Sequence, residues 1–190
     1  MIGQATYKEF DVIDPESLQN PAEWGPSGSI LQAGAWRWPI VYSNSDKILP
    51  LIQDKHCIDF GGGAAPVAYG AQVVDRLTEN KSLIDLPGQW DTIFTCHTLE
   101  HIVDISLCVQ MIHAKLKPGG HIVAVVPSWQ FTKLRAENWP HHAQTFYLWR
   151  DVDRTEPGWQ PLDAGLATVG FTIDHAEDDG DCILVIGRKD

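Results

Sequence analysis

From residue 55 onward, short apolar segments typical of β-strands alternate with segments of helical periodicity. Helices are predicted over residues 104–116 and 162–169, the second stopped by Gly170. The predicted strands cover residues 57–60, 71–74, 91–96, 121–126, 171–176 and 182–187. Strands that are apolar throughout are buried on both faces, so this pattern predicts an α/β fold with a mostly parallel sheet between two layers of helices. The last two strands flank an aspartate-rich turn and predict a closing antiparallel hairpin.

The first 54 residues have a different character, because they are rich in Pro, Gly, Ser and Trp and lack sustained periodicity. They predict a loop-rich segment that partly caps the domain, so we divide the chain into residues 1–54 and 55–190. A short helix is compatible with residues 46–53 only if Pro50 lies in its first turn, where the missing N–H is harmless. Trp36 and Trp38 are expected to attach this segment to the domain, since a large aromatic ring buries roughly 150–250 Å².

The charge balance excludes some classes of partner. Fourteen Lys and Arg against 25 Asp and Glu give a formal net charge of −11, which repels a nucleic acid. A small molecule or a protein is the expected substrate, with neither nucleic acid nor membrane as a partner. No apolar run has the length of a membrane helix and the N-terminus lacks signal-peptide features, so we expect a cytosolic location. The four cysteines form no C-x-x-C pair and are expected in the core, without disulfides or a metal.

The strand over residues 57–60 runs directly into a glycine turn, Gly61-Gly62-Gly63. Glycines let the backbone pass close beneath a ligand, and free amides after such a turn hold carboxylates or phosphates. Asp75 closes the second strand, where a carboxylate can accept both hydroxyls of a ribose. This arrangement alone is compatible with a dinucleotide or with S-adenosylmethionine.

Two later segments distinguish between these cofactors. The strand over residues 91–96 leads through His97-Thr98 into Leu99-Glu100-His101, and Lys117-Pro118-Gly119-Gly120 precedes another strand. In this order and spacing they closely resemble the motifs of class I S-adenosylmethionine-dependent methyltransferases, over about residues 55–190. The resemblance implies a Rossmann-like three-layer sandwich with a mostly parallel seven-stranded sheet and an antiparallel C-terminal hairpin. It also implies S-adenosylmethionine as cofactor and transfer of its methyl group to an oxygen or nitrogen nucleophile of a small molecule.

The family pattern places the loops after the strands 57–60 and 91–96 side by side around one pocket. It implies that Gly61 and Gly63 carry the methionine end of the cofactor, Asp75 its ribose, and Asp85 and Leu86 the border of its adenine. The full predicted cofactor set is Asp59, Gly61, Gly62, Gly63, Asp75, Asp85, Leu86, Cys96 and His97. This chain departs from the pattern, because only six residues separate Gly63 from Gly70 and the first helix is cut to about one turn. The link to Asp85 is also short, so either the third strand is vestigial or the adenine border lies elsewhere.

Four histidines are candidates for a general base that deprotonates the acceptor, because imidazole titrates near neutral pH. His97 is the first candidate, since it leaves the strand end at the expected pocket. His101 has an alternative role as a structural residue at the following turn. His141 and His142 lie in a segment where this family often builds its substrate wall, and an exposed loop is the alternative for them.

Three other functions each match part of the sequence. His97-Thr98-Leu99-Glu100-His101 fits the H-x-x-E-H pattern of inverted zinc proteases, but that chemistry needs both histidines on one helical face, and His97 directly follows a strand. A non-catalytic protein of the same fold is compatible with the shortened first helix. A nicotinamide-dependent oxidoreductase is compatible with the glycine turn but not with the Leu-Glu-His segment.

Overall fold

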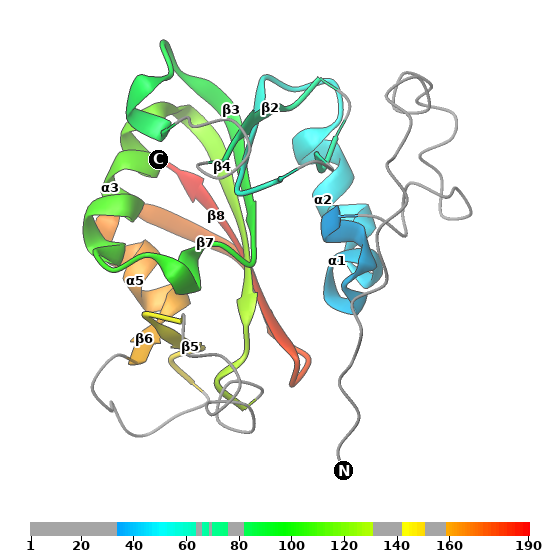
Figure 1. Cartoon of the computed structure of the whole chain (residues 1–190), viewed down its shortest axis with the longest axis vertical. Coiled ribbons are helices and arrows are strands. Elements are labelled where there is room, and N and C mark those ends of the chain that lie inside the picture. Colours follow the sequence, from blue (N-terminus) through cyan, green and yellow to red (C-terminus); the bar gives the residue numbers. More distant parts are fainter. Residues whose placement is uncertain (1–33, 64–65, 69, 76–81, 131–141, 151–158) are drawn as a thin grey trace.

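The computed structural model describes residues 34–63, 66–68, 70–75, 82–130, 142–150 and 159–190. Their centre is a six-stranded sheet in the order β2-β1-β3-β4-β8-β7 (Figure 1). The strands are β1 (Cys57–Phe60), β2 (Gln72–Val74), β3 (Trp90–Cys96), β4 (Leu116–Pro127), β7 (Phe171–Asp178) and β8 (Cys182–Lys189). The pairs β1–β2, β1–β3 and β3–β4 are parallel, whereas β8 is antiparallel to both of its neighbours. The predicted α/β fold, with a mostly parallel sheet and a closing hairpin, is confirmed.

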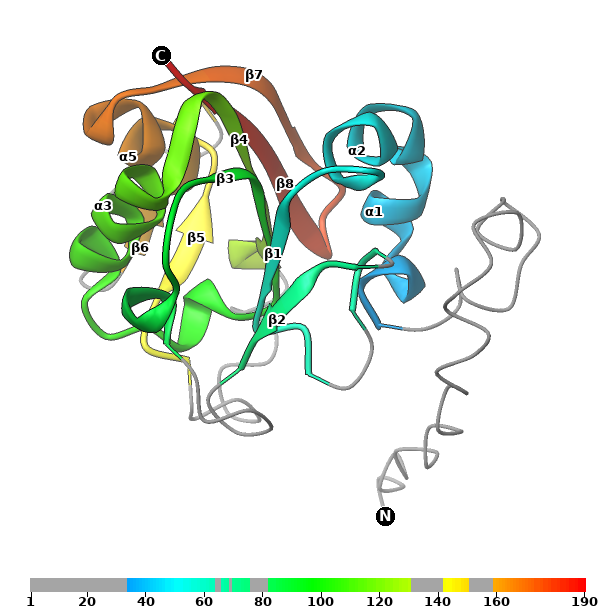
Figure 2. The same cartoon turned by 90° about the horizontal axis from the view of Figure 1, so that it is seen from above.

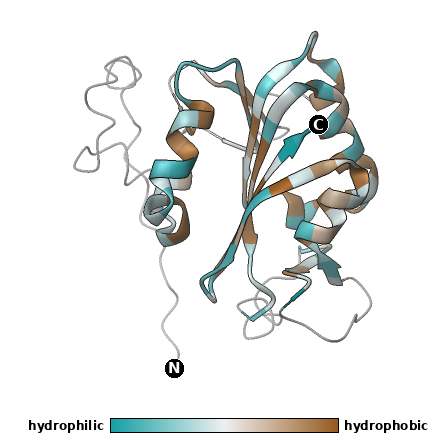
Figure 3. Cartoon of the chain, turned by 180° about the vertical axis from the view of Figure 1, so that it is seen from behind, coloured by the Kyte–Doolittle hydropathy of each residue, from teal (hydrophilic) through white to brown (hydrophobic). Residues whose placement is uncertain are grey.

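Helices cover both faces of this sheet, which gives three layers (Figures 1 and 2). On one face lie α3 (Ile105–Lys115) and α5 (Leu162–Val169), and on the other lie α1 (Pro39–Ser43) and α2 (Ser45–Ile52). Each face has its own buried cluster, because alternate strand residues such as Ile93 and Phe94 point to opposite sides. In Figure 3 the hydrophobic residues gather along the central strands, whereas the β7–β8 turn is hydrophilic. None of the helices in the described ranges is long and apolar enough to cross a bilayer.

The predicted count of seven strands is wrong for the part of the chain that the structure describes. Where the reduced third strand was expected, residues Leu83–Asp85 form a 3-10 turn instead. The Ser82 hydroxyl accepts from the amide of Ile84, and the Asp85 carboxylate accepts from the amide of Ser82. These local hydrogen bonds satisfy backbone amides that a strand would pair with a neighbouring strand, so the segment is stable outside the sheet. Two short parallel strands outside the main sheet, β5 (Thr145–Tyr147) and β6 (Trp159–Pro161), were not predicted.

The end of the N-terminal segment is helical rather than loop-rich, because α1 and α2 occupy most of residues 39–52. Pro50 lies near the end of α2, so the requirement for a first-turn position was wrong. Both Pro50 and Asp46, four residues earlier, are exposed, so the carbonyl without an amide partner lies near water. Ile48 and Ile52 are fully buried and attach the helix to the sheet. The division of the chain after residue 54 stays a prediction.

The boundaries of α3 and α5 follow from their end residues. Asp104 caps α3 by accepting from the amide of Leu107, and α5 ends at Gly170, whose φ of +107° is unfavourable for any side chain. A β-carbon at Gly170 would also meet Nε2 of His113 at 3.3 Å. Gly165 lies inside the same helix, and a β-carbon there would meet no atom within 4 Å.

We predict opposite effects on stability for the same substitution at these two glycines. Gly170→Ala should lower the free energy of unfolding by about 1–2 kcal/mol, because it forces an alanine into a left-handed conformation. Gly165→Ala should raise it by about 0.5–1 kcal/mol, because glycine is a poor helix former. Urea denaturation measures both values, and a destabilised Gly165→Ala variant would contradict the packing described here.

Candidate active site

The loops that follow β1 and β3 touch each other at the carboxyl ends of these neighbouring strands. The Thr98 hydroxyl lies 3.2 Å from the carbonyl oxygen of Phe60, to which it donates. A β-carbon at Gly61 would overlap the side chain of Thr98, so only glycine allows this approach. The structure therefore brings the glycine turn and the Cys96–His101 loop together, at the edge of an open α/β sheet where ligands bind.

Each end of the glycine turn is fixed by a neighbouring element. Gly61 has a φ of +84°, and its amide donates to the carbonyl of Val74 at 2.9 Å, which places Asp75 beside the turn. A β-carbon at Gly62 would overlap the Asp59 carboxylate. Gly63 differs, because no atom of the described residues lies within 4 Å of its missing β-carbon. Within the described part of the chain, the turn thus packs closely at Gly61 and Gly62 but not at Gly63.

Asp59 supports the turn from beneath instead of facing solvent. Its side chain is 2% exposed, and Oδ2 accepts from the amide of Val67 at 2.6 Å. Burial raises the pKa of Asp59 to about 7, and the negative charge of Asp75 acts in the same direction. No helix is present in the described residues between β1 and β2. The hydrogen bond from Val67 to Asp59 instead fixes this connecting loop against the end of β1.

His97, the first candidate for a base, is enclosed by protein groups. Its ring stacks on Trp38 with 3.9 Å between centroids, and its φ of +52° turns it out of the line of β3. Nδ1 lies 3.4 Å from Oε1 of Glu100, and Nε2 lies 3.4 Å from Sγ of Cys182. With the side chain 17% exposed and a protein group at each nitrogen, His97 is placed to orient its neighbours.

His101 and His142 come together from separate segments of the chain. Their rings meet edge to face with centroids 5.0 Å apart, and the side chain of His101 is 44% exposed. The amides of Ala143 and Gln144 donate to the carbonyl of Glu100 at 2.7 and 3.0 Å, which fixes the second segment against the first. The sequence named both histidines as candidates, but no local pattern indicated that they meet.

The remaining predicted site residues are placed differently. Cys96 ends β3 and packs, partly buried, against the cluster beneath α1 and α2. The carbonyl of Leu86 accepts from Nζ of Lys115 at the end of α3, so Asp85 and Leu86 lie toward the amino ends of β3 and β4. They are not brought together with the glycine turn, and their adenine-binding role stays a prediction. His141 lies outside the described residues.

The zinc-protease alternative fails on geometry. The 3-10 turn begins at Leu99, and His97 with its positive φ lies outside it. His97 and His101 therefore do not share a helical face, which that chemistry requires. No local sequence pattern indicated the role of Glu100, which is 1% exposed and lies between the two histidines.

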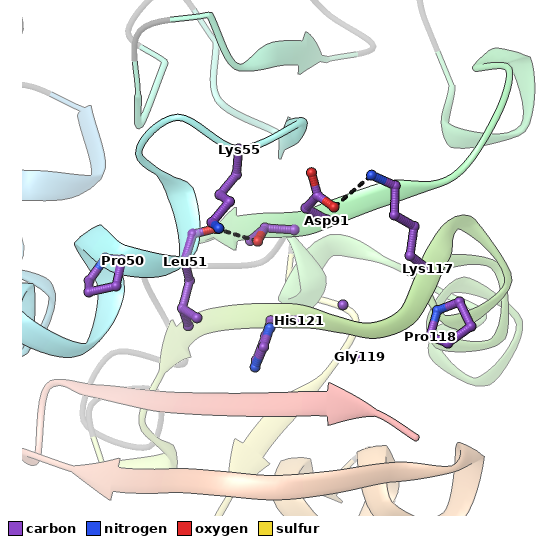
Figure 4. Close-up of a pocket in the computed structure, with 10 residues that line it drawn as sticks. Pro50, Leu51, Lys55, Asp91, Lys117, Pro118, Gly119 and His121 are labelled. Atoms are coloured by element: carbon purple, nitrogen blue, oxygen red, sulfur yellow. Dashed lines mark hydrogen bonds and ion pairs between the residues drawn. The ribbon is translucent and has the colours of Figure 1, made fainter.

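A pocket lies at the opposite ends of the strands from the candidate active site, at the amino ends of β3 and β4 (Figure 4). Lys55, Lys117 and His121 line it, and Nζ of Lys117 forms an ion pair with Asp91 at 2.7 Å. Ligands of open α/β sheets bind at the carboxyl ends of the strands, so this pocket is separate from the candidate active site.

The buried carboxylate of Asp59 predicts an unusual pH dependence of stability. Because its pKa is raised to about 7 in the folded chain, the folded state holds a proton that the unfolded state releases above about pH 4. The free energy of unfolding should therefore fall as the pH rises from about 4 to 7, by up to about 4 kcal/mol from this group. Asp59→Asn should remove that contribution.

Urea denaturation between pH 4.5 and 8 measures the difference between wild type and Asp59→Asn. The stability of the variant relative to wild type should increase steadily with pH. Asp46→Asn, at an exposed position in α2, is the control and should follow the wild-type curve. Parallel curves for all three proteins would show that Asp59 ionises in the folded chain as it does in the unfolded one.

Comparison with known proteins agrees with the fold. Residues 39–155 match the family model for a methyltransferase domain, whereas none of the curated proteins matches the chain. An S-adenosylmethionine-dependent methyltransferase from Mesorhizobium loti superposes with a TM-score of 0.56 at 17% identity, covering 87% of this chain and 100% of that one. A putative one from Listeria monocytogenes gives 0.54 at 14% identity, covering 78% and 97%.

A third solved structure includes the demethylated cofactor. The N-methyltransferase NodS from Bradyrhizobium japonicum, in complex with S-adenosyl-L-homocysteine, gives a TM-score of 0.50 at 17% identity, covering 92% of this chain and 97% of that one. At these identities the structures establish the fold, and the family model covers more than half of the chain. The chain therefore belongs to the methyltransferase-domain family, and it has the fold of S-adenosylmethionine-dependent methyltransferases.

Proposed function

We propose that the chain transfers the methyl group of S-adenosylmethionine to an oxygen or nitrogen atom of a small molecule, at the edge where the loops after β1 and β3 meet. The observation that carries this proposal is the contact between Gly61 and Thr98. This contact places the glycine turn, which has no side chains, next to the loop after β3, which carries imidazoles, so that both can contact one ligand. The cofactor supplies an electrophilic methyl group on a sulfonium sulfur.

The residues at this edge fit the proposed cofactor. No described residue crowds the β-carbon position of Gly63, which fits the methionine end of the cofactor, whose carboxylate backbone amides can bind. The hydrogen bond from Gly61 to Val74 holds Asp75 next to that turn, where its carboxylate can accept the ribose hydroxyls. Asp59 takes part indirectly, because it fixes the loop from below.

The acceptor side of the site is proposed from charge and exposure. The net charge of −11 opposes a nucleic acid as the acceptor and is compatible with a small molecule or a protein, of which we propose the small molecule. A cytosolic location stays a prediction. Methyl transfer is an in-line displacement, in which orientation of the reactants contributes up to about 7–11 kcal/mol. The enclosed ring of His97 fits such an orienting role, whereas His101 is exposed enough to reach an acceptor proton.

Calorimetry and isotope transfer test the proposal. We expect S-adenosylmethionine and S-adenosylhomocysteine to bind with micromolar affinity, and a labelled methyl group to pass to a compound in a small-molecule extract. Binding without any transfer would indicate the non-catalytic alternative. The absence of binding at millimolar cofactor would contradict the proposed function itself.

We predict that Asp75→Ala weakens binding of S-adenosylhomocysteine at least tenfold, which corresponds to about 1.4 kcal/mol, the loss of a charge-assisted hydrogen bond. Titration calorimetry measures the affinity, and circular dichroism verifies the fold. Asp46→Ala, an exposed position in α2, is the control and should leave the affinity unchanged. Asp85→Ala tests the adenine border separately, since a weakened affinity in this variant would support the predicted adenine-binding role of Asp85. An unchanged affinity for Asp75→Ala would mean that the ribose lies elsewhere.

A further inference from the structure

Three side chains with metal-binding atoms meet beside the loop that follows β3. They are Glu100, His101 and His142, and one ligand atom of each lies within 4.8 Å of the other two. Two ligands of one cation are separated by at most twice a metal–ligand bond, or about 4.2 Å for bonds of about 2.1 Å. Small side-chain adjustments would therefore bring all three into one coordination sphere.

The buried carboxylate of Glu100 favours binding of a cation by the cluster. It is 1% exposed, and in the described part of the chain its Oε2 has no hydrogen-bond partner. Its Oε1 lies 3.4 Å from Nδ1 of His97 and 3.8 Å from Nε2 of His101. A carboxylate oxygen that is removed from water without a partner costs free energy, and a bound cation offsets this cost.

Backbone bonds hold the two segments of the cluster in register. The Glu100 carbonyl accepts from the amides of Ala143 and Gln144, directly after His142. The side-chain amide of Gln144 donates to the carbonyls of Ile102 and Val103 at 3.2 and 3.1 Å, on the other side of His101. The ligands thus belong to a preformed unit, as supporting hydrogen bonds provide in known metal sites.

We propose that Glu100, His101 and His142 bind one divalent transition-metal cation. Two imidazoles and one carboxylate are typical ligands of Zn²⁺, Co²⁺, Mn²⁺ and Fe²⁺, whereas Mg²⁺ and Ca²⁺ prefer oxygen ligands alone. The exposure of His101 leaves coordination positions open to water or to another ligand. This site differs from the H-x-x-E-H pattern, because Glu100 is a ligand and His97 is not.

The position of the cation has a consequence for the proposed methyl transfer. The cluster begins two residues after Thr98, which touches the glycine turn. A cation there would polarise an oxygen acceptor and lower its pKa, so that the acceptor could lose its proton to water without an imidazole as the base. This consequence rests on the proposed function, whereas binding of the cation does not.

Cobalt titration of the chelator-treated protein, without a histidine tag, tests the site. We expect visible absorption bands that saturate at one Co²⁺ per chain and disappear when Zn²⁺ is added. Glu100→Gln and His142→Gln should each weaken Co²⁺ binding at least tenfold. His175→Gln is the matched control, since this imidazole also lies beside a carboxylate, 3.2 Å from Glu177, and should leave cobalt binding unchanged.

Two further measurements distinguish weak Co²⁺ binding caused by unfolding from weak binding caused by the loss of a metal-ligand side chain. Circular dichroism verifies each variant, and Gln144→Ala leaves all three ligands in place but should weaken Co²⁺ binding several-fold by loosening the second segment. Absence of Co²⁺ binding in the wild type, or equal binding in Glu100→Gln and wild type, would overturn the proposal. Calorimetry with S-adenosylhomocysteine separates the hypotheses, because a failure of cofactor binding leaves the cobalt result standing, and the reverse also holds.

Discussion

The close approach of Gly61 to the Thr98 side chain is the constraint on which the rest of the site depends. Parallel pairing of β1 with β3 brings the ends of these strands together, and the missing β-carbon lets the two loops touch. A side chain at Gly61 would push the loops apart, together with Asp75 and the imidazoles that they carry. Contact between the two loops therefore requires both the parallel pairing of β1 with β3 and a glycine at position 61, since either alone would leave the loops apart.

The sequence predicts well those elements whose signal is local. The helix Leu162–Val169 and the strand Cys57–Phe60 have the predicted bounds, because periodicity and Gly170 mark them within a few residues. It predicts poorly the elements that depend on packing far along the chain. The helices α1 and α2 are short, and α2 includes Pro50. They are stabilised because Ile40 and Ile48 are buried against a sheet whose strands lie later in the chain.

The same distinction holds within the site. The glycine turn and the two loops were predicted from motifs, and the structure brings them together. The enclosure of His97 was not, because Trp38 and Cys182 lie 59 residues before and 85 residues after it. The meeting of Glu100 with His142 was missed for a similar reason, since hydrogen bonds between two segments separated by α3 and β4 create it. Local sequence thus indicates which groups carry chemistry, while tertiary contacts decide which of them face each other.

The shortened segment after Gly63 has a structural replacement for its lost helix. A helix satisfies its own backbone groups, and a buried loop in its place needs other partners. Val67 is 1% exposed, its amide donates to Asp59, and its carbonyl accepts from Nε1 of Trp36 at 2.9 Å. Both backbone groups of this buried residue are therefore satisfied by side chains, one from the sheet and one from the N-terminal segment. Trp38 of the same segment stacks on His97. The region before β1 therefore contacts both the loop after β1 and the loop after β3, and it helps to hold the candidate site in place.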